Sequence, residues 1–187
     1  MHSSRIRRAA LFAAAVLAVS AAPANAASLV KTTTDCGAPT VTQPFAPWGD
    51  NAWYKPVDGG SFENGAAGWD LRGGAHVADA ALSLPPGSSA VSAPVCVGHD
   101  EPTMRFFAGG ARSLSVAVQF ELVNGTRVTL PIGLDSGGGW APSPTMLVLA
   151  NLLPPRGEQT AVRFVFTPLL GGDWQIDDVY VDPRMRI

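Results

Sequence analysis

The segment Leu114-Ser-Val-Ala-Val-Gln-Phe-Glu-Leu122 alternates large apolar side chains with small or polar ones. A period of two is typical of a strand with one face in a core and the other in water. The same period returns in residues 128–132 and again in residues 162–166. The sequence therefore predicts three strands whose inner faces carry the larger apolar side chains.

The turn between the first two of these strands contains Gly125. A two-residue hairpin loop would pair Glu121 with Val128 and would place a charge on the core face. A three-residue loop, residues 123–125, pairs Phe120 with Val128 instead. It requires only that Gly125 adopt the left-handed conformation, which glycine does at little cost. The sequence favours the three-residue loop.

Shorter apolar runs predict further strands, which are separated by segments rich in Gly, Pro and Ser. These runs are residues 66–72, 75–80, 82–84, 90–97, 103–108 and 145–151. Many short strands spaced about ten residues apart indicate a β-sandwich or barrel rather than alternating α/β units. With 20 Gly and 16 Pro, the chain also disfavours long helices.

The first 26 residues have the layout of a secretory signal peptide. Three arginines lie between positions 5 and 8, and the apolar stretch that follows, Ala9 to Val19, is too short to span a bilayer. A small-x-small triplet then ends at Ala26. We expect cleavage after Ala26 and a secreted, extracellular protein without membrane insertion; the alternative is an N-terminal membrane anchor.

Removal of this segment makes the protein more acidic. All 15 acidic residues follow position 26, whereas three of the 13 basic residues precede it, so the exported chain has a net charge of −5. A moderately acidic chain without clusters of basic residues in its sequence argues against nucleic acid and anionic membranes as partners.

Cys36 and Cys96 are the two cysteines of the chain. In an oxidising compartment they are expected to form one disulfide, which would close a loop worth about 4 kcal/mol in the chain-entropy model. This bond would tether an extended N-terminal arm, residues 27–56, to a sandwich domain, residues 57–187. The alternative is a reactive or metal-binding thiol pair, for which only His99 lies nearby in sequence.

Two motifs carry a family resemblance. Gly59-Gly-Ser-Phe-Glu-Asn-Gly65, followed by Trp69, opens the domain, and Trp174-Gln-Ile-Asp-Asp-Val-Tyr-Val-Asp182 closes it. Together they resemble the jelly-roll carbohydrate-binding modules and the wider galactose-binding-like superfamily, and the chain also resembles secreted actinobacterial proteins of this layout. The resemblance implies an all-β jelly-roll β-sandwich, galactose-binding-like, whose first and last segments lie side by side.

The closing motif contains a change of phase. Trp174 and Ile176 share one strand face, and Val179 and Val181 share a face, but the two pairs are out of phase. A β-bulge at Asp177-Asp178 would let both pairs face the core.

Many galactose-binding-like domains hold a structural calcium between their opening and closing segments, and the matching positions here are Glu63 and Asp178. Adjacent carboxylates repel each other, and Ca²⁺ prefers carboxylate and carbonyl oxygens. The resemblance therefore implies a Ca²⁺ site at Glu63 and Asp178. The alternative is that Glu63 accepts backbone hydrogen bonds. Zinc is disfavoured because His76 and His99 belong to no ligand-spaced cluster.

Enzymatic activity is not predicted. The chain has no G-x-S-x-G nucleophile motif, and Ser136 lies in a glycine-rich segment that is typical of a connection between strands. Glycoside hydrolysis needs only two carboxylates, which the sequence leaves open, but one small sandwich offers little room for a deep cleft.

Binding is the better-supported class. Trp140 lies in a Gly- and Pro-rich segment, residues 137–142, where an aromatic ring is expected to be exposed and could stack on a sugar. The alternative is that Trp140 anchors its loop. A polar strand face could line a groove or could be an ordinary solvated face; it carries Gln119, Glu121, Arg127, Thr129 and Arg163.

Two functions follow. The first is a secreted non-catalytic module that binds an extracellular polysaccharide or cell-wall glycan, or acts in adhesion. The second is a structural or interaction protein of the cell envelope or spore surface without a small-molecule ligand.

Overall fold

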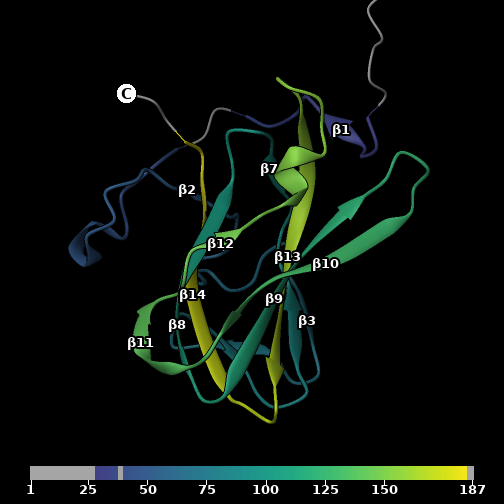
Figure 1. The fold of residues 1–187 in the computed structure, drawn as a ribbon. Helices are drawn as coiled ribbons and strands as arrows, with labels where there is room; N and C mark the ends of the chain where they lie inside the picture. Colours follow the sequence, from purple (N-terminus) through teal and green to yellow (C-terminus); the bar gives the residue numbers. More distant parts are fainter. Residues whose placement is uncertain (1–27, 38–39, 185–187) are drawn as a thin grey trace, which may run out of the picture.

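A computed structural model of the protein describes residues 28–37 and 40–184. They form two antiparallel β-sheets packed face to face (Figure 1). The fold is an all-β jelly-roll sandwich, as the sequence predicts. The expected signal peptide, residues 1–26, lies outside the described residues. No helix within the described part of the chain is long and apolar enough to cross a membrane.

The first sheet is ordered β10-β9-β13-β6-β3, and two further strands, β1 and β7, also pair with β13. Its strands are β1 (Thr32–Thr33), β3 (Asp70–Arg72), β6 (Ser89–Val91), β7 (Val95–Val97), β9 (Ser113–Glu121), β10 (Arg127–Asp135) and β13 (Gln159–Leu169).

The second sheet is ordered β11-β8-β14-β5-β4, with β2 added beside β14 and β12 beside β8. Its strands are β2 (Lys55–Pro56), β4 (His76–Ala78), β5 (Ala81–Leu84), β8 (Thr103–Gly110), β11 (Gly138–Pro142), β12 (Met146–Leu147) and β14 (Trp174–Asp182). The two short 3-10 helices are η1 (Ala46–Trp48) and η2 (Ala150–Leu152).

The predicted alternation places the core between the sheets. The alternate residues Leu114, Val116 and Val118 of β9 are fully buried, as are Phe164 and Phe166 of β13. Burial of each such side chain stabilises the fold by about 1.5–3 kcal/mol. The residues that alternate with them, most of which are half-buried, form the outer face of the first sheet.

The predicted hairpin between β9 and β10 is confirmed. Val128 pairs with Phe120, and the Gly125 N–H donates to the Leu122 carbonyl across a three-residue loop. Gly125 has a φ of +82°, the conformation that the loop requires. The hairpin projects beyond the body of the sandwich (Figure 1).

The predicted bulge in the closing strand is also confirmed. The pairing of β14 with β8 shifts between Asp177 and Tyr180, and Asp178 has a φ of +52°. As a result Trp174, Ile176, Val179 and Val181 all face the core with at most 2% of their surface exposed.

The strand predicted over residues 90–97 is interrupted in the structure. β6 ends at Val91 and β7 begins at Val95. Pro94 has no N–H to donate to the neighbouring strand, and the Ser92 side chain takes the place of a backbone acceptor for β13. The Ser92 hydroxyl accepts the Phe164 N–H at 2.8 Å and donates to the Ala93 carbonyl. Side-chain bonding of this kind competes with regular pairing.

Other boundaries differ as well. Regular pairing is restricted to Asp70–Arg72 within residues 66–72, to His76–Ala78 within 75–80, and to Met146–Leu147 within 145–151. Residues 138–142, expected as a loop, form the edge strand β11. Leu130, expected to face the core, is 39% exposed because β10 is an edge strand with a neighbour on one side only.

The segment before residue 57 packs on both sheets. β1 pairs with β13 and β2 pairs with β14. Between them, Phe45 and Tyr54 form a second apolar cluster with Phe107 of β8 and Tyr180 of β14.

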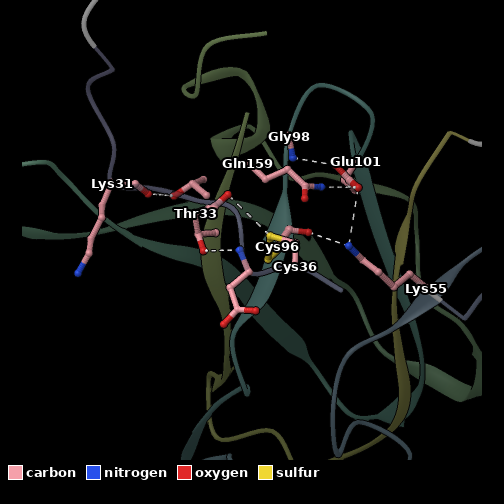
Figure 2. The surroundings of a disulfide bond; sticks show 10 residues. Lys31, Thr33, Cys36, Lys55, Cys96, Gly98, Glu101 and Gln159 are labelled. Atoms are coloured by element: carbon pink, nitrogen blue, oxygen red, sulfur yellow. Dashed lines mark hydrogen bonds and ion pairs between the residues drawn. A yellow bond between two sulfur atoms is a disulfide. The ribbon is translucent and has the colours of Figure 1, made fainter. Parts of the chain in front are cut away.

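The predicted disulfide between Cys36 and Cys96 is confirmed, with a Cα–Cα distance of 5.8 Å. A buried polar network lies beside it (Figure 2). The Lys55 ammonium donates to the Cys96 carbonyl at 2.8 Å and lies 3.7 Å from the Glu101 carboxylate. Glu101 in turn accepts the Gly98 N–H and the Gln159 amide. This network fixes Lys55, and therefore the end of the N-terminal segment, against the sandwich.

Candidate functional site

Trp140 lies at the edge of the second sheet, in β11, with 51% of its surface exposed. Its indole covers Gly109 of β8. A Cβ atom at Gly109 would lie 3.4 Å from Trp140 Cε3 and 3.3 Å from the Trp140 backbone nitrogen. The missing side chain at Gly109 therefore lets the indole lie against the sheet while half of the residue stays open to solvent.

A second half-exposed tryptophan borders the same surface. Trp48 in η1 is 56% exposed and packs edge to face on Phe107, with ring centroids 5.1 Å apart. Phe107 and Gly109 are two residues apart on β8, so they point to the same outer face of the sheet. The sequence places Trp48 in the N-terminal segment but gives no sign that this segment folds over β8.

Polar side chains of β14 lie beside the two tryptophans, on the neighbouring strand of the same sheet. Gln175 pairs with Gly109, and Asp177 pairs with Phe107. Gln175 is exposed and Asp177 is half-buried. Burial raises the pKa of Asp177 to about 6, and the nearby charges of Asp178 and Glu63 add to this effect. We call the surface made by Trp48, Phe107, Gly109, Trp140, Gln175 and Asp177 the tryptophan face.

The opening and closing segments lie side by side, as the resemblance implies. The Val57 N–H donates to the Val179 carbonyl at 2.8 Å, and the Val179 N–H donates to the Gly60 carbonyl at 3.2 Å. A small hollow of about 200 Å³ lies between residues 56–61 and 178–180.

The predicted calcium ligands lie at this junction. Asp178 is half-buried and accepts the Tyr180 hydroxyl at 3.3 Å, whereas Glu63 is exposed. Burial raises the pKa of Asp178, and the Glu63 charge raises it further. In residues 28–37 and 40–184, no three Asp, Glu, His or Cys side chains are grouped as metal ligands. The assignment of calcium to Glu63 and Asp178 stays a prediction.

The outer face of the first sheet is hollowed where most of its predicted polar residues lie. Two adjoining hollows have volumes of about 360 and 420 Å³ and share Gln119, Arg127 and Arg163. One extends to Lys31 and the other to Arg72. We call this surface the arginine groove; its polar lining residues are Lys31, Thr32, Thr33, Asp70, Arg72, Gln119, Glu121, Arg127 and Arg163.

Strand register brings the groove residues together. Arg163 of β13 pairs with Gln119 of β9, which pairs with Thr129 of β10. The Gln119 amide donates to the Thr129 hydroxyl at 3.2 Å. Arg163 Nη1 donates to the Ser92 carbonyl at 2.6 Å and to the Gly68 carbonyl at 3.4 Å. These bonds hold the Arg163 guanidinium at the base of the groove.

The two acidic residues of the groove are each paired. Glu121 lies 3.3 Å from the Lys31 ammonium, and Asp70 pairs with Arg72. The hydrogen bond from Arg72 lowers the pKa of Asp70, and the charges of Arg72 and Arg163 lower it further. No ion pair joins Arg127 or Arg163 to a carboxylate within the described part of the chain. The groove therefore has an excess of positive charge.

Comparison with known proteins gives structural neighbours only. No family model and no curated protein matches the sequence. A mutant of the carbohydrate-binding module CBM29-2, made for probing ligand recognition by family 29, aligns with a TM-score of 0.50 and 12% identity. The alignment covers 70% of this chain and 85% of that chain.

Two further solved structures are similar. Another mutant of a family 29 carbohydrate-binding module aligns with a TM-score of 0.50 and 12% identity, covering 70% of this chain and 91% of that chain. A xylan-binding domain from CBM 22 aligns with a TM-score of 0.46 and 14% identity, covering 74% and 99% of the two chains. The family 29 alignments show that the chain has the jelly-roll fold of carbohydrate-binding modules.

Proposed function

We propose that this protein is a secreted, non-catalytic carbohydrate-binding module that binds an extracellular polysaccharide or cell-wall glycan on the tryptophan face. The observation that carries the proposal is the pair of half-exposed indoles, Trp48 and Trp140, at the borders of one sheet face. Large apolar side chains that stay open to solvent and gather on one surface mark interaction sites. The fold of the structural neighbours supports the same class of function.

The chemistry of the face suits a sugar. An indole offers a flat apolar surface on which the C–H face of a pyranose can stack, while polar side chains bind its hydroxyl groups. Gln175 supplies an amide with donors and an acceptor, and Asp177 supplies a carboxylate. Gln175 and Asp177 pair with Gly109 and Phe107, the two β8 residues that the indoles contact, so they lie beside the two indoles on the same face.

The absence of catalysis is part of the proposal, and the position of the carboxylates supports it. Hydrolysis of a glycoside needs two carboxyl groups on opposite sides of the scissile bond. Asp177 and Asp178 are instead neighbours on one bulge, and Asp177 lies on an outer sheet face.

We also propose that Glu63 and Asp178 bind a structural Ca²⁺ beside this face. The repulsion between these carboxylates, which raises the pKa of Asp178, would be relieved by a cation. With Glu63 and Asp178 as the proposed acidic ligands, the remaining ligands would be backbone carbonyls and water, and we expect a weak site.

The main test is a glycan array, followed by pull-down with insoluble polysaccharides. The variants are Trp140→Ala and Trp48→Ala, with Leu170→Ala as the control because Leu170 is 76% exposed in a turn after β13. Loss of one stacking contact should weaken binding by about tenfold, or about 1.4 kcal/mol. Leu170→Ala should bind as the parent protein does.

Two outcomes would overturn the proposal. If the parent protein binds no glycan, the structural or interaction role at the cell envelope or spore surface is favoured instead. If both tryptophan variants bind a glycan as tightly as the parent protein, the binding site is elsewhere on the molecule.

A further inference from the structure

We propose that the arginine groove is a second binding site, on the opposite sheet from the tryptophan face, and that it takes an acidic polysaccharide whose sugars carry carboxylate groups. Each site can be tested without the other, because they lie on the outer faces of different sheets.

The first argument is the distribution of charge. The exported chain has a net charge of −5, yet four of its ten Lys and Arg residues line this one groove. They are separated in sequence, so the sequence shows no basic cluster; Lys31 directly precedes β1, and the others lie on β3, β10 and β13. An acidic protein that collects its cations on one face is complementary to an anion there.

The second argument is the arrangement of ion pairs along the groove. At one end Lys31 pairs with Glu121, and at the other Arg72 pairs with Asp70. Both of the groove's carboxylates are thereby neutralised. Arg127 and Arg163 line both hollows and form no ion pair within the part of the chain that the structure describes, so their guanidinium groups can pair with a ligand.

The third argument is that the centre of the groove is prepared for binding. Two backbone carbonyls fix one nitrogen of Arg163, which leaves its other donors free to face the groove. A guanidinium fork matches a carboxylate in a bidentate geometry, and a fixed side chain loses little entropy on binding. Beside it, Gln119 and Thr129 offer hydrogen bonds to sugar hydroxyls.

The shape of the groove favours an extended chain over a small anion. The two hollows adjoin and together extend from Lys31, beside the ends of β9 and β13, to Arg72 on the edge strand β3. A linear polymer can follow this path and meet Arg127 and Arg163 with different carboxylates. Nucleic acid is less suitable, because its affinity comes mainly from many phosphate contacts, and within the described residues this groove has two guanidinium groups that are not paired with a carboxylate.

The test uses one polymer in two charge states, namely polygalacturonate oligosaccharides and their fully methyl-esterified form. Affinities are measured by calorimetry at low and at high ionic strength. We expect the charged polymer to bind at low ionic strength, and we expect esterification or salt to weaken binding by about tenfold or more. Trp140→Ala should leave this binding unchanged, which separates the groove from the tryptophan face.

The variants are Arg127→Gln and Arg163→Gln, with Arg156→Gln as the matched control. Arg156 is exposed in the turn between η2 and β13, outside the groove. Arg127→Gln is the cleaner variant, because the Arg127 side chain makes no hydrogen bond or ion pair within residues 28–37 and 40–184. Thermal unfolding must confirm that Arg163→Gln is folded. Each groove variant should lose about tenfold in affinity, and Arg156→Gln should lose nothing.

Three outcomes would overturn the proposal. They are no binding of polygalacturonate at low ionic strength, an equal loss in Arg156→Gln, and tighter binding of a single-stranded oligonucleotide than of polygalacturonate. A protein that fails these tests but binds a neutral glycan through Trp140 would retain the function proposed for the tryptophan face.

Discussion

Glu101 contacts Lys55, Gly98 and Gln159, which belong to three segments of the chain beside the disulfide. Its replacement by glutamine tests how much this buried network contributes to the free energy of unfolding. Its side chain is 8% exposed, and that of its partner Lys55 is 13% exposed. One carboxylate oxygen accepts the Gly98 N–H at 2.8 Å, and the other accepts the Gln159 amide at 3.0 Å. The carboxylate thus neutralises a buried ammonium and satisfies two donors together.

Glutamine has nearly the same shape but only one acceptor oxygen. If that oxygen faces Gly98, the new amide group points its hydrogens at the Gln159 amide and the Lys55 ammonium, which are also donors. Breaking a buried pair by removing one charge costs about 3–5 kcal/mol. Lys55 keeps its bond to the Cys96 carbonyl, so we expect the lower end, a loss of about 3 kcal/mol in the free energy of unfolding.

The pH dependence of the loss has a definite sign. Burial lowers the pKa of Lys55, and the Glu101 charge opposes this effect, so removal of Glu101 should lower the pKa further. The folded variant then binds fewer protons at Lys55 than the unfolded chain does at alkaline pH. Stability therefore rises with pH in this region. The deficit of Glu101→Gln should shrink as the pH approaches the ordinary Lys value of 10.5.

The assay is urea unfolding of the oxidised protein, followed by tryptophan fluorescence at neutral pH. The matched control is Glu121→Gln, because Glu121 and its partner Lys31 are 39% and 69% exposed. An exposed pair contributes about 0–1 kcal/mol. The double variant Lys55→Met/Glu101→Gln should recover part of the loss. Equal stabilities of Glu101→Gln and Glu121→Gln would refute the reasoning.

Two further predictions concern the bulge. The pKa of Asp177 is raised from 3.8 to about 6, so the folded state binds more protons than the unfolded chain between these values, and stability falls as pH rises through this window. In EDTA, Asp177→Asn should therefore be more stable than the parent protein at neutral pH, by about 1 kcal/mol after allowance for solvent screening. Below pH 3.8 the two proteins should be equally stable. A gain in stability that persists in acid would show that it does not come from the raised pKa of Asp177. If Glu63 and Asp178 bind Ca²⁺, saturating Ca²⁺ should raise the melting temperature by about 3 °C over EDTA at fixed ionic strength. The rise should vanish in Asp178→Asn, which keeps an acceptor for Tyr180, and no rise in the parent protein would exclude the site.

Features that depend on local patterns could be predicted from the sequence. The phase change around Asp177-Asp178 can be resolved only by a bulge if both apolar pairs are to be buried, and the structure has that bulge. The three-residue loop at Gly125 follows from the need to keep Glu121 out of the core. The pairing of Cys36 with Cys96 follows because the chain has two cysteines.

Features that depend on distant contacts could not be predicted. Trp48 reaches the second sheet because Phe45, which is fully buried, packs on Phe107 and Tyr180. The residues around Phe45 in the sequence do not indicate that it contacts these two distant side chains. Trp140 was expected in a loop because its neighbours are Gly and Pro. The backbone of β11 nevertheless pairs with β8, since pairing at a sheet edge needs free N–H and C=O groups rather than β-branched side chains.

The two candidate surfaces depend on different parts of the chain, although the same alternation creates both. On β9 and β13 the inward residues build the core, and their outward neighbours form the groove. On β8 and β14 the outward face is shared between the N-terminal segment and the solvent. Trp48 is held there by the packing of Phe45 on Phe107 and by the ion pair of Asp50 with Arg105, and the segment that carries it is attached at its two ends through the disulfide and Lys55. A change in the buried network should therefore reach the tryptophan face before it reaches the centre of the groove, where Arg127 and Arg163 are carried by long strands of the sandwich.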